Sequence, residues 1–480
     1  MGSSSTAPGE RNTGKILTVR SLLVVALLVG AVCAAIGVGG EGEIIDDIER
    51  YFSSNSLNTR GEIIARIEAD PAYDPKNLSA LLHRARVFEA PDATGGIDEF
   101  SVPLEHGESR TVSARIPANY DAATAWPMIY ALHGTGGNAK SIIQYFERLL
   151  GERIEQFVVV APNDYEQVVI HSAGDPSDEH LRVLSEARKR LHLDSDRIYC
   201  AGYSRGGHTA WTLAILHADE FASVLSLAGT FNLMGVDQLW EPFLPNIQHL
   251  PVYHVWGAHD DGGHSGLASP EGGIAGVSRL LRDRVEALKL PVTCYEYPER
   301  GHDNIVPPPE ILDRWLKHER VHDPKTLQKT FRWPYQASAY WIKGEDWTGN
   351  HWDEKPFTVQ PRKDESALDA YHRAIRARLG NLEATVEGQT VDIRRKKLRS
   401  AVIWIGDDLI DWDHPVAIRV SGREYFEGML TRDLDLCLMQ ARRTRDFDRL
   451  RWSGVIFRSG KRPEVIQAQT EFPRGWDVTR

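Results

Sequence analysis

The chain has 480 residues, enough for a large core and for more than one domain, because domains usually hold about 100 to 200 residues. Its formal net charge is −11. This acidic balance argues against a nucleic-acid partner, which would require a clustered basic patch. None of the four cysteines has the C-x-x-C spacing of a metal knuckle or a dithiol redox site, and no disulfide framework is indicated.

An uncharged run from Ser21 to Val38 follows three basic residues and precedes an acidic segment. This arrangement predicts that residues 1–40 are a signal peptide or a membrane anchor, which leaves the rest of the chain periplasmic or extracellular. Any contact with a membrane is then confined to this segment. Cys33 does not predict a lipoprotein, because Val32 is too bulky for the small residue that precedes a lipidated cysteine.

Residues 41–97 have a helical hydrophobic period with breaks at proline and predict a small helical lead-in. Residues 98–325 alternate β-prone runs with helical segments. Strands are expected at 100–104, 111–116, 127–132, 157–161, 198–201, 222–227, 252–256 and 292–297. Helices are expected near 138–151, 178–192, 205–218, 274–288 and 308–317. This alternation predicts an α/β fold, with a mainly parallel sheet and helices on both faces.

The stretch IYCAGYSRGGHTAW, residues 198–211, places Ser204 between glycines where a strand gives way to a helix. The G-x-S-x-G pattern alone is weak, since it also arises from composition. A serine on a tight strand-to-helix turn, however, is held in a strained and exposed conformation. Gly202 and Gly206 have no side chains, so none collides with the backbone in this tight turn. Ser204 is therefore predicted to be a nucleophile rather than a simple turn residue.

Two candidate partners follow Ser204 in chain order. Asp260 closes the segment VYHVWGAHD at the end of one strand, and His302 lies in a loop after the next strand. Each residue alone would be interpreted as a turn or solvated residue. The order Ser, Asp, His at successive strand ends is what one sheet edge needs to assemble a catalytic triad. The neighbouring Asp261 is expected to face solvent.

A glycine-rich loop, HGTGG at residues 133–137, follows the strand at 127–132. Such a loop can turn a backbone N–H toward the serine turn, and its glycines leave room for a substrate carbonyl. The expected oxyanion donors are the N–H groups of Arg205 and of Thr135 or Gly136. An ordinary glycine-rich loop remains the alternative. A phosphate-binding loop is disfavoured because the G-K-[ST] arrangement is lacking.

Two groups of His and Asp side chains lie close together in the sequence but do not predict metal sites. Neither has the ligand spacing of a known zinc or calcium site, so no metal or cofactor is predicted. The groups are His259, Asp260, Asp261 and His264, and Asp407, Asp408, Asp411 and Asp413.

Within residues 98–320, the pieces LHGTGG, LDSDRIYCAGYSRGG, VYHVWGAHDD and GHD resemble the α/β-hydrolases. More narrowly, they are similar to secreted bacterial esterases grouped with poly(3-hydroxybutyrate) depolymerases and feruloyl esterases. The resemblance implies that Ser204 is the nucleophile, His302 the base and Asp260 the orienting acid. Arg205 follows the nucleophile where many of these relatives have Met or Gln, so their acyl preference is not carried over.

The resulting hypothesis is an exported serine hydrolase that cleaves carboxylic esters through an acyl-enzyme, without a cofactor. Its substrate is an ester, with polymeric and carbohydrate-linked esters left open. One alternative is a prolyl-oligopeptidase-like serine peptidase, which has the same fold and triad order. A noncatalytic binding protein on a hydrolase scaffold is the other, and the intact triad argues against it.

Residues 326–480 are expected to form a small β-rich accessory domain. Eight of the thirteen tryptophans lie after residue 330, where a buried core is favoured over stacking on sugars. The segment PVAIRVSGREYFEG predicts a hairpin that turns at Ser421 and Gly422, followed by a helix near 434–443 and a last strand at 451–457. Because the triad precedes this domain, its removal is expected to spare the hydrolysis of small esters.

Overall fold

The computed structural model describes residues 40–466 except 92, 105–106, 169–175, 231–239, 262–272, 304 and 349–358. The segment predicted to be a signal peptide or anchor lies outside the described residues, apart from residue 40. Among the helices of the described ranges, none combines the length and the apolar composition that a membrane crossing requires. The chain forms two compact units, one that ends at Leu81 and one that begins at Leu82.

The first unit contains the helices α2 (Glu41–Ser53) and α3 (Leu57–Ala69) and the short turn η1 (Pro75–Asn77). The helix α4 (Leu78–Arg84) contains the boundary between the two units. Isoleucines at helical spacing on α2 and α3 are buried, as the hydrophobic period predicts. Arg66 on α3 donates two hydrogen bonds, of 3.0 and 2.7 Å, to the Asp47 carboxylate on α2.

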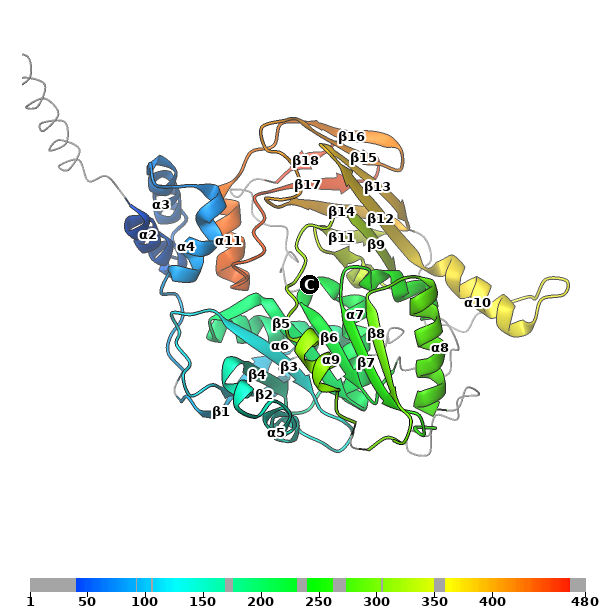
Figure 1. Cartoon of the computed structure of the whole chain (residues 1–480). Helices are drawn as coiled ribbons and strands as arrows, with labels where there is room; N and C mark the ends of the chain where they lie inside the picture. The colour runs from blue at the N-terminus through cyan, green and yellow to red at the C-terminus, as the bar shows by residue number, and fades with distance from the viewer. Residues whose placement is uncertain are drawn as a thin grey trace, which may run out of the picture. The chain divides into compact units, whose positions relative to one another are not determined.

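The second unit contains an eight-stranded sheet (Figure 1). Its strands are β1 (Gly96–Pro103), β2 (Ser109–Ile116), β3 (Trp126–Leu132), β4 (Val158–Pro162), β5 (Leu193–Tyr203), β6 (Ser223–Leu227), β7 (Val252–Gly257) and β8 (Val292–Tyr297). Their order is β1-β2-β4-β3-β5-β6-β7-β8, and only the pairs β1–β2 and β2–β4 are antiparallel. The predicted mainly parallel sheet is confirmed, and this strand order is that of the α/β-hydrolase fold.

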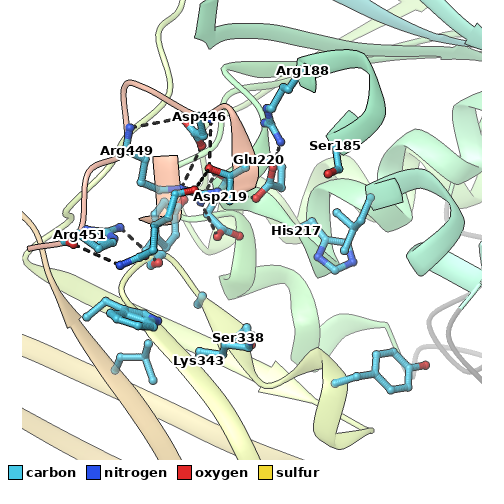
Figure 2. A pocket seen from close by; sticks show the side chains of 18 residues that line it. Ser185, Arg188, His217, Asp219, Glu220, Ser338, Lys343, Asp446, Arg449 and Arg451 are labelled. Atoms are coloured by element: carbon cyan, nitrogen blue, oxygen red, sulfur yellow. Dashed lines mark hydrogen bonds and ion pairs between the residues drawn. The ribbon is translucent and has the colours of Figure 1, made fainter. Parts of the chain in front are cut away.

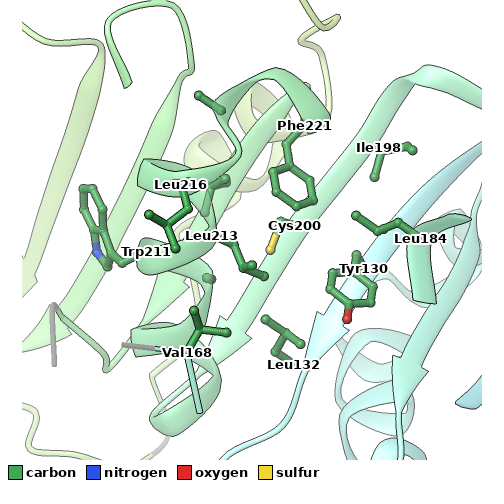
Figure 3. Packing of buried hydrophobic residues seen from close by; sticks show 14 of the residues in the cluster. Tyr130, Leu132, Val168, Leu184, Ile198, Cys200, Trp211, Leu213, Leu216 and Phe221 are labelled. Atoms are coloured by element: carbon green, nitrogen blue, oxygen red, sulfur yellow. The ribbon is translucent and has the colours of Figure 1, made fainter. Parts of the chain in front are cut away.

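Helices cover both faces of this sheet. They are α5 (Ala139–Leu150), α6 (Pro176–Arg190), α7 (Arg205–Leu216), α8 (Gly273–Ala287) and α9 (Pro309–Trp315). Along β3, Met128 and Tyr130 join the apolar cluster with α6, α7 and α8, whereas Ile129 and Ala131 join the cluster with α5 and α9. This alternation of faces is the two-residue period of a strand. Figure 3 shows the first cluster around Cys200, a free and buried thiol.

The part after residue 325 is β-rich, with two five-stranded sheets in the orders β10-β11-β14-β17-β18 and β16-β15-β13-β12-β9. The first contains β10 (Ser338–Ala339), β11 (Ile342–Trp347), β14 (Leu398–Ile405), β17 (Ser453–Arg458) and β18 (Glu464–Val465). The second contains β9 (Thr326–Phe331), β12 (Gly380–Glu387), β13 (Thr390–Lys396), β15 (Val416–Val420) and β16 (Arg423–Gly428). Both sheets contribute to one apolar cluster. Two helices, α10 (Ala367–Arg378) and α11 (Leu434–Thr444), accompany them.

The predicted hairpin is confirmed: β15 and β16 pair antiparallel, and Ser421 and Gly422 have φ values of 52° and 75°. Two positive φ values suit a two-residue hairpin turn. The expectation of a last strand at 451–457 was wrong in one respect, because β18 follows β17. Of the tryptophans in this part, three are buried (Trp341, Trp404 and Trp452) and three are half-buried (Trp333, Trp347 and Trp412), whereas Trp352 and Trp476 lie outside the described residues.

The β-rich part is joined to the hydrolase sheet by buried polar contacts at the end of α7. Lys329 on β9 is 2% exposed, and its ammonium donates to the carbonyls of Leu216 (2.6 Å) and Ile215 (3.3 Å). Burial lowers the pKa of Lys329 to about 8. A cation placed here satisfies carbonyls that a helix end leaves without partners. Asn246 adds hydrogen bonds both to Ile215 and to Thr330 on β9.

A network of ion pairs extends the same junction around a cavity of about 150 Å³ (Figure 2). Arg449 donates hydrogen bonds to Asp219 (3.0 Å) and Glu220 (2.7 Å). Arg320 donates two hydrogen bonds of 2.8 Å to the Asp446 carboxylate. Burial alone would raise the pKa of Asp446, but the Arg320 and Arg449 guanidiniums hold it well below its ordinary value. Both parts therefore belong to one compact unit. Truncation at about residue 330 would remove Asp446 and Arg449 from this network. The expected tolerance of small-ester hydrolysis to this truncation stays a prediction.

We expect Asp446→Asn to lower the free energy of unfolding by about 3–5 kcal/mol, because it removes one charge of a buried pair and leaves Arg320 undercompensated. Glu464→Gln is the matched control, since its exposed pair with Arg458 should contribute less than about 1 kcal/mol. Thermal unfolding followed by far-UV circular dichroism compares the two. Equal midpoints for both variants would show that the junction does not stabilise the unit.

Candidate active site

Ser204 occupies the sharp turn between β5 and α7, with φ 54° and ψ −117°. Such a conformation is rare for a residue with a side chain and marks a strained turn. The flanking glycines are required by close packing. A Cβ on Gly202 would lie 2.0 Å from the Gly206 carbonyl oxygen, and a Cβ on Gly206 would lie 2.0 Å from that of Leu132. The strand–turn–helix geometry of a nucleophile elbow is therefore present.

The structure brings the three predicted triad side chains together. His302 Nε2 lies 2.8 Å from Ser204 Oγ, and His302 Nδ1 lies 2.8 Å from Asp260 Oδ2. Asp260 is 5% exposed, whereas Asp261 is exposed. These distances are within hydrogen-bond reach for a nucleophile, a base and an orienting carboxylate.

Two loops from neighbouring strands hold this alignment. The loop after β7 and the loop after β8 pack so closely that a Cβ on Gly257 would lie 2.2 Å from the Gly301 carbonyl oxygen. The His259 amide also donates to the Arg300 carbonyl at 2.9 Å. Because Gly257 precedes Asp260 by three residues and Gly301 directly precedes His302, this contact fixes both side chains at the edge of the sheet.

The electrostatics favour a basic imidazole. The hydrogen bond to the Asp260 carboxylate raises the pKa of His302 above its ordinary value of 6.5, against the lowering effect of partial burial. Charge from Asp260, and from Asp303 more weakly, acts in the same direction. A carboxylate on Nδ1 leaves Nε2 as the nitrogen that faces the serine hydroxyl, which suits proton transfer from Ser204.

The predicted oxyanion donors lie on two elements beside Ser204. Gly137 N–H donates to the Gly134 carbonyl at 3.1 Å, so Thr135 and Gly136 are the central residues of a turn, and Gly136 has φ 75°. Thr135 lines the cleft that contains Ser204 and His302. The Arg205 amide belongs to the first turn of α7, where amides have no acceptor within the helix.

Two tyrosines that the sequence analysis did not select support the site. The Tyr203 hydroxyl donates to the His302 backbone carbonyl, and the Tyr165 hydroxyl donates to the His133 carbonyl at 2.6 Å. In the G-x-S-x-G pattern, Tyr203 occupies the variable position before Ser204, which specifies no residue type. Its role depends on a loop 99 residues away, so no local signal could reveal it.

Within the described ranges, the structure gathers no group of three or more His, Cys, Asp or Glu side chains that could hold a metal ion. His264, one member of the group at the β7 loop, lies outside the described residues. Asp411 accepts from the Asp413 amide at 3.0 Å and contacts His414 at 2.8 Å, which is an ordinary turn arrangement.

Comparisons with known proteins find similar esterases and, over a shorter part of the chain, similar peptidases. Residues 105–298 match the family model described as putative esterase. Probable feruloyl esterase C of Aspergillus flavus is 23% identical over 39% of this chain and 74% of that protein. Dipeptidyl-peptidase 5 of Porphyromonas endodontalis is 29% identical over 27% of this chain, which spans only 20% of that longer protein.

Among solved structures, a ferulic acid esterase from the anaerobic fungus Anaeromyces mucronatus is 15% identical, covering 45% of this chain and 89% of the other, with a TM-score of 0.33. The family match covers the described strands from β2 to β8 and includes Ser204 and Asp260. Together with the strand order, this match supports an α/β-hydrolase esterase over residues 105–298.

Proposed function

We propose that this protein is a serine hydrolase that cleaves carboxylic esters through an acyl-enzyme, with Ser204 as nucleophile, His302 as base and Asp260 as orienting acid. The observation that carries the proposal is the continuous line of two 2.8 Å contacts from Asp260 through His302 to Ser204. The match of residues 105–298 to an esterase family supports the choice of bond.

In this mechanism, His302 takes the proton of Ser204 as the hydroxyl oxygen attacks the ester carbonyl carbon. Asp260 keeps the imidazole in the required tautomer and stabilises the imidazolium. The N–H groups of Arg205 and of Thr135 or Gly136 stabilise the oxyanion, with about 10²- to 10³-fold in rate for each donor. His302 then protonates the leaving alcohol, and an activated water releases the acid from Ser204.

The proposed substrates include carbohydrate-linked esters. Two observations support this class: the relatives named feruloyl esterase C, and a bifunctional acetylxylan esterase/xylanase of Neocallimastix patriciarum that is 24% identical over 42% of this chain. Such substrates lie outside the cell, in agreement with the export predicted from residues 1–40. The matches to dipeptidyl-peptidase 5 keep a peptidase activity as the second candidate.

We expect purified protein to hydrolyse 4-nitrophenyl acetate and methyl ferulate with a kcat/KM at least about 100-fold above that for dipeptidyl 4-nitroanilides. The reason is that an alcohol or phenolate leaves the tetrahedral intermediate more readily than an amine, which must first be protonated. The release of 4-nitrophenol, ferulate or 4-nitroaniline measures the three reactions. Faster cleavage of the anilides would instead assign the peptidase, and labelling by a fluorophosphonate without turnover of any substrate would contradict both.

A further inference from the structure

One face of α5 forms a wall of the cleft beside the triad. Ser141, Ile142, Tyr145 and Arg148 line this cleft of about 420 Å³. Ser141, Tyr145 and Arg148, at intervals of four and three residues, lie on the same side of the helix. Ile142 directly follows Ser141. The helix begins directly after the glycine-rich loop, where Asn138 caps it by accepting from the Ser141 amide at 3.0 Å. Its first turn is therefore next to the proposed oxyanion donors.

Arg148 is the only Lys, Arg, Asp or Glu side chain among the described residues that line this cleft. It is exposed, and no residue of the described ranges forms a hydrogen bond or an ion pair with it. Other cations on or near α5 are paired: Lys140 with Glu99, Arg115 with Glu147 and Glu155, and Arg153 with Asp313. Asp303, the residue after His302, raises the pKa of His302. A guanidinium without an acidic partner thus faces the substrate space.

Part of the cleft lining that Ser204 and Arg148 share is apolar. Ile142 and Ile305 line the cleft there, and the rings of Tyr145 and Tyr203 lie 6.4 Å apart. The Tyr145 hydroxyl is occupied by the Ile305 carbonyl at 3.2 Å, so the ring presents its carbon atoms to the cleft wall. This lining suits a hydrocarbon or aromatic spacer.

We propose that Arg148 forms an anion subsite, so that the enzyme prefers esters with a carboxylate at the far end of an apolar spacer. This inference rests on the proposed ester hydrolysis. A helix rises 1.5 Å per residue, which separates Ser141 from Arg148 by about 10 Å along α5. Side chains lean toward the N-terminus of their helix, so the guanidinium reaches back toward Ser204. The carboxylate should therefore lie about 6–10 Å from the scissile carbonyl.

Two substrate series locate the carboxylate on the acyl or on the alcohol side. The acyl series compares the mono(4-nitrophenyl) esters of glutaric, adipic and suberic acids with 4-nitrophenyl alkanoates of equal length. The alcohol series compares the acetate ester of 4-hydroxybenzoic acid with 4-methylphenyl acetate. In low salt we expect kcat/KM to favour the carboxylated member of one series by about three- to tenfold, as one charge-assisted pair at a partly exposed site contributes. Added salt should reduce this preference.

Variants on one helix test the residue. Arg148→Gln should bring the ratio of carboxylated to neutral kcat/KM to about one, and Arg148→Lys should retain part of the preference because it keeps the charge. Lys140→Gln removes the same charge from α5 outside the cleft lining and should retain the full ratio. A ratio at or below one in both wild-type series, or a preference that survives Arg148→Gln, would overturn the anion subsite while ester hydrolysis stands. Loss of hydrolysis for every ester would instead refute the proposed function and this inference with it.

Discussion

Ser204→Ala should reduce ester turnover by about 10⁴- to 10⁶-fold, because it removes the hydroxyl that lies 2.8 Å from His302 Nε2 and forms the proposed acyl-enzyme. Residual hydrolysis is expected from the oxyanion donors and substrate binding alone. The substitution keeps the Cβ and removes one oxygen, so the strained turn at φ 54° is populated as before and the fold should be retained. Initial rates on 4-nitrophenyl acetate and labelling by a fluorophosphonate measure the effect.

The matched control is Ser101→Ala, which removes an exposed hydroxyl from β1. It should label and turn over as the wild type does. Thermal unfolding of all three proteins establishes that they are equally folded. Turnover of Ser204→Ala within tenfold of the wild type, in a folded sample, would remove Ser204 from the mechanism and with it the acyl-enzyme proposal.

Asp260→Asn should reduce turnover by about 10⁴-fold, whereas Asp261→Asn should have little effect. The two residues are adjacent and lose the same charge, but only Asp260 is buried against His302, with Oδ2 2.8 Å from Nδ1. An asparagine at that position permits the wrong imidazole tautomer and no longer stabilises the imidazolium. The ratio of kcat for the two variants on one ester provides the measurement. The reverse ranking would assign the orienting carboxylate to Asp261.

The pH profile adds a second readout to this pair of variants. The base must be neutral to accept a proton, so kcat/KM falls as the pH drops through the pKa of His302. Asp260 raises that pKa above 6.5, and its removal should therefore move the acid limb to lower pH. In Asp261→Asn the limb should stay at its wild-type position. An unchanged limb in Asp260→Asn would mean that Asp260 acts only on the packing of the loop.

The local patterns of the sequence were sufficient to predict the strands of the eight-stranded sheet and the helices that cover it. Buried strands such as β3 and β4 are continuous apolar runs, and helices such as α5 have a clear apolar face, so short windows identify them. The β-rich part was predicted less well. β18 contains only two residues, both exposed, and so has no periodic pattern to detect.

The sequence by itself determined the candidate nucleophile, base and acid. The glycines around Ser204 and the positions of Asp260 and His302 after successive predicted strands can be recognised in the sequence alone. Tertiary structure alone decided the rest. The distances within the triad depend on the contact between Gly257 and Gly301, and the Tyr203 hydroxyl finds its acceptor on another loop. The buried position of Lys329 at the end of α7 joins segments 113 residues apart. Such contacts are set by how the strands are ordered in the sheet and how the two parts pack, and neither is encoded in any local window of residues.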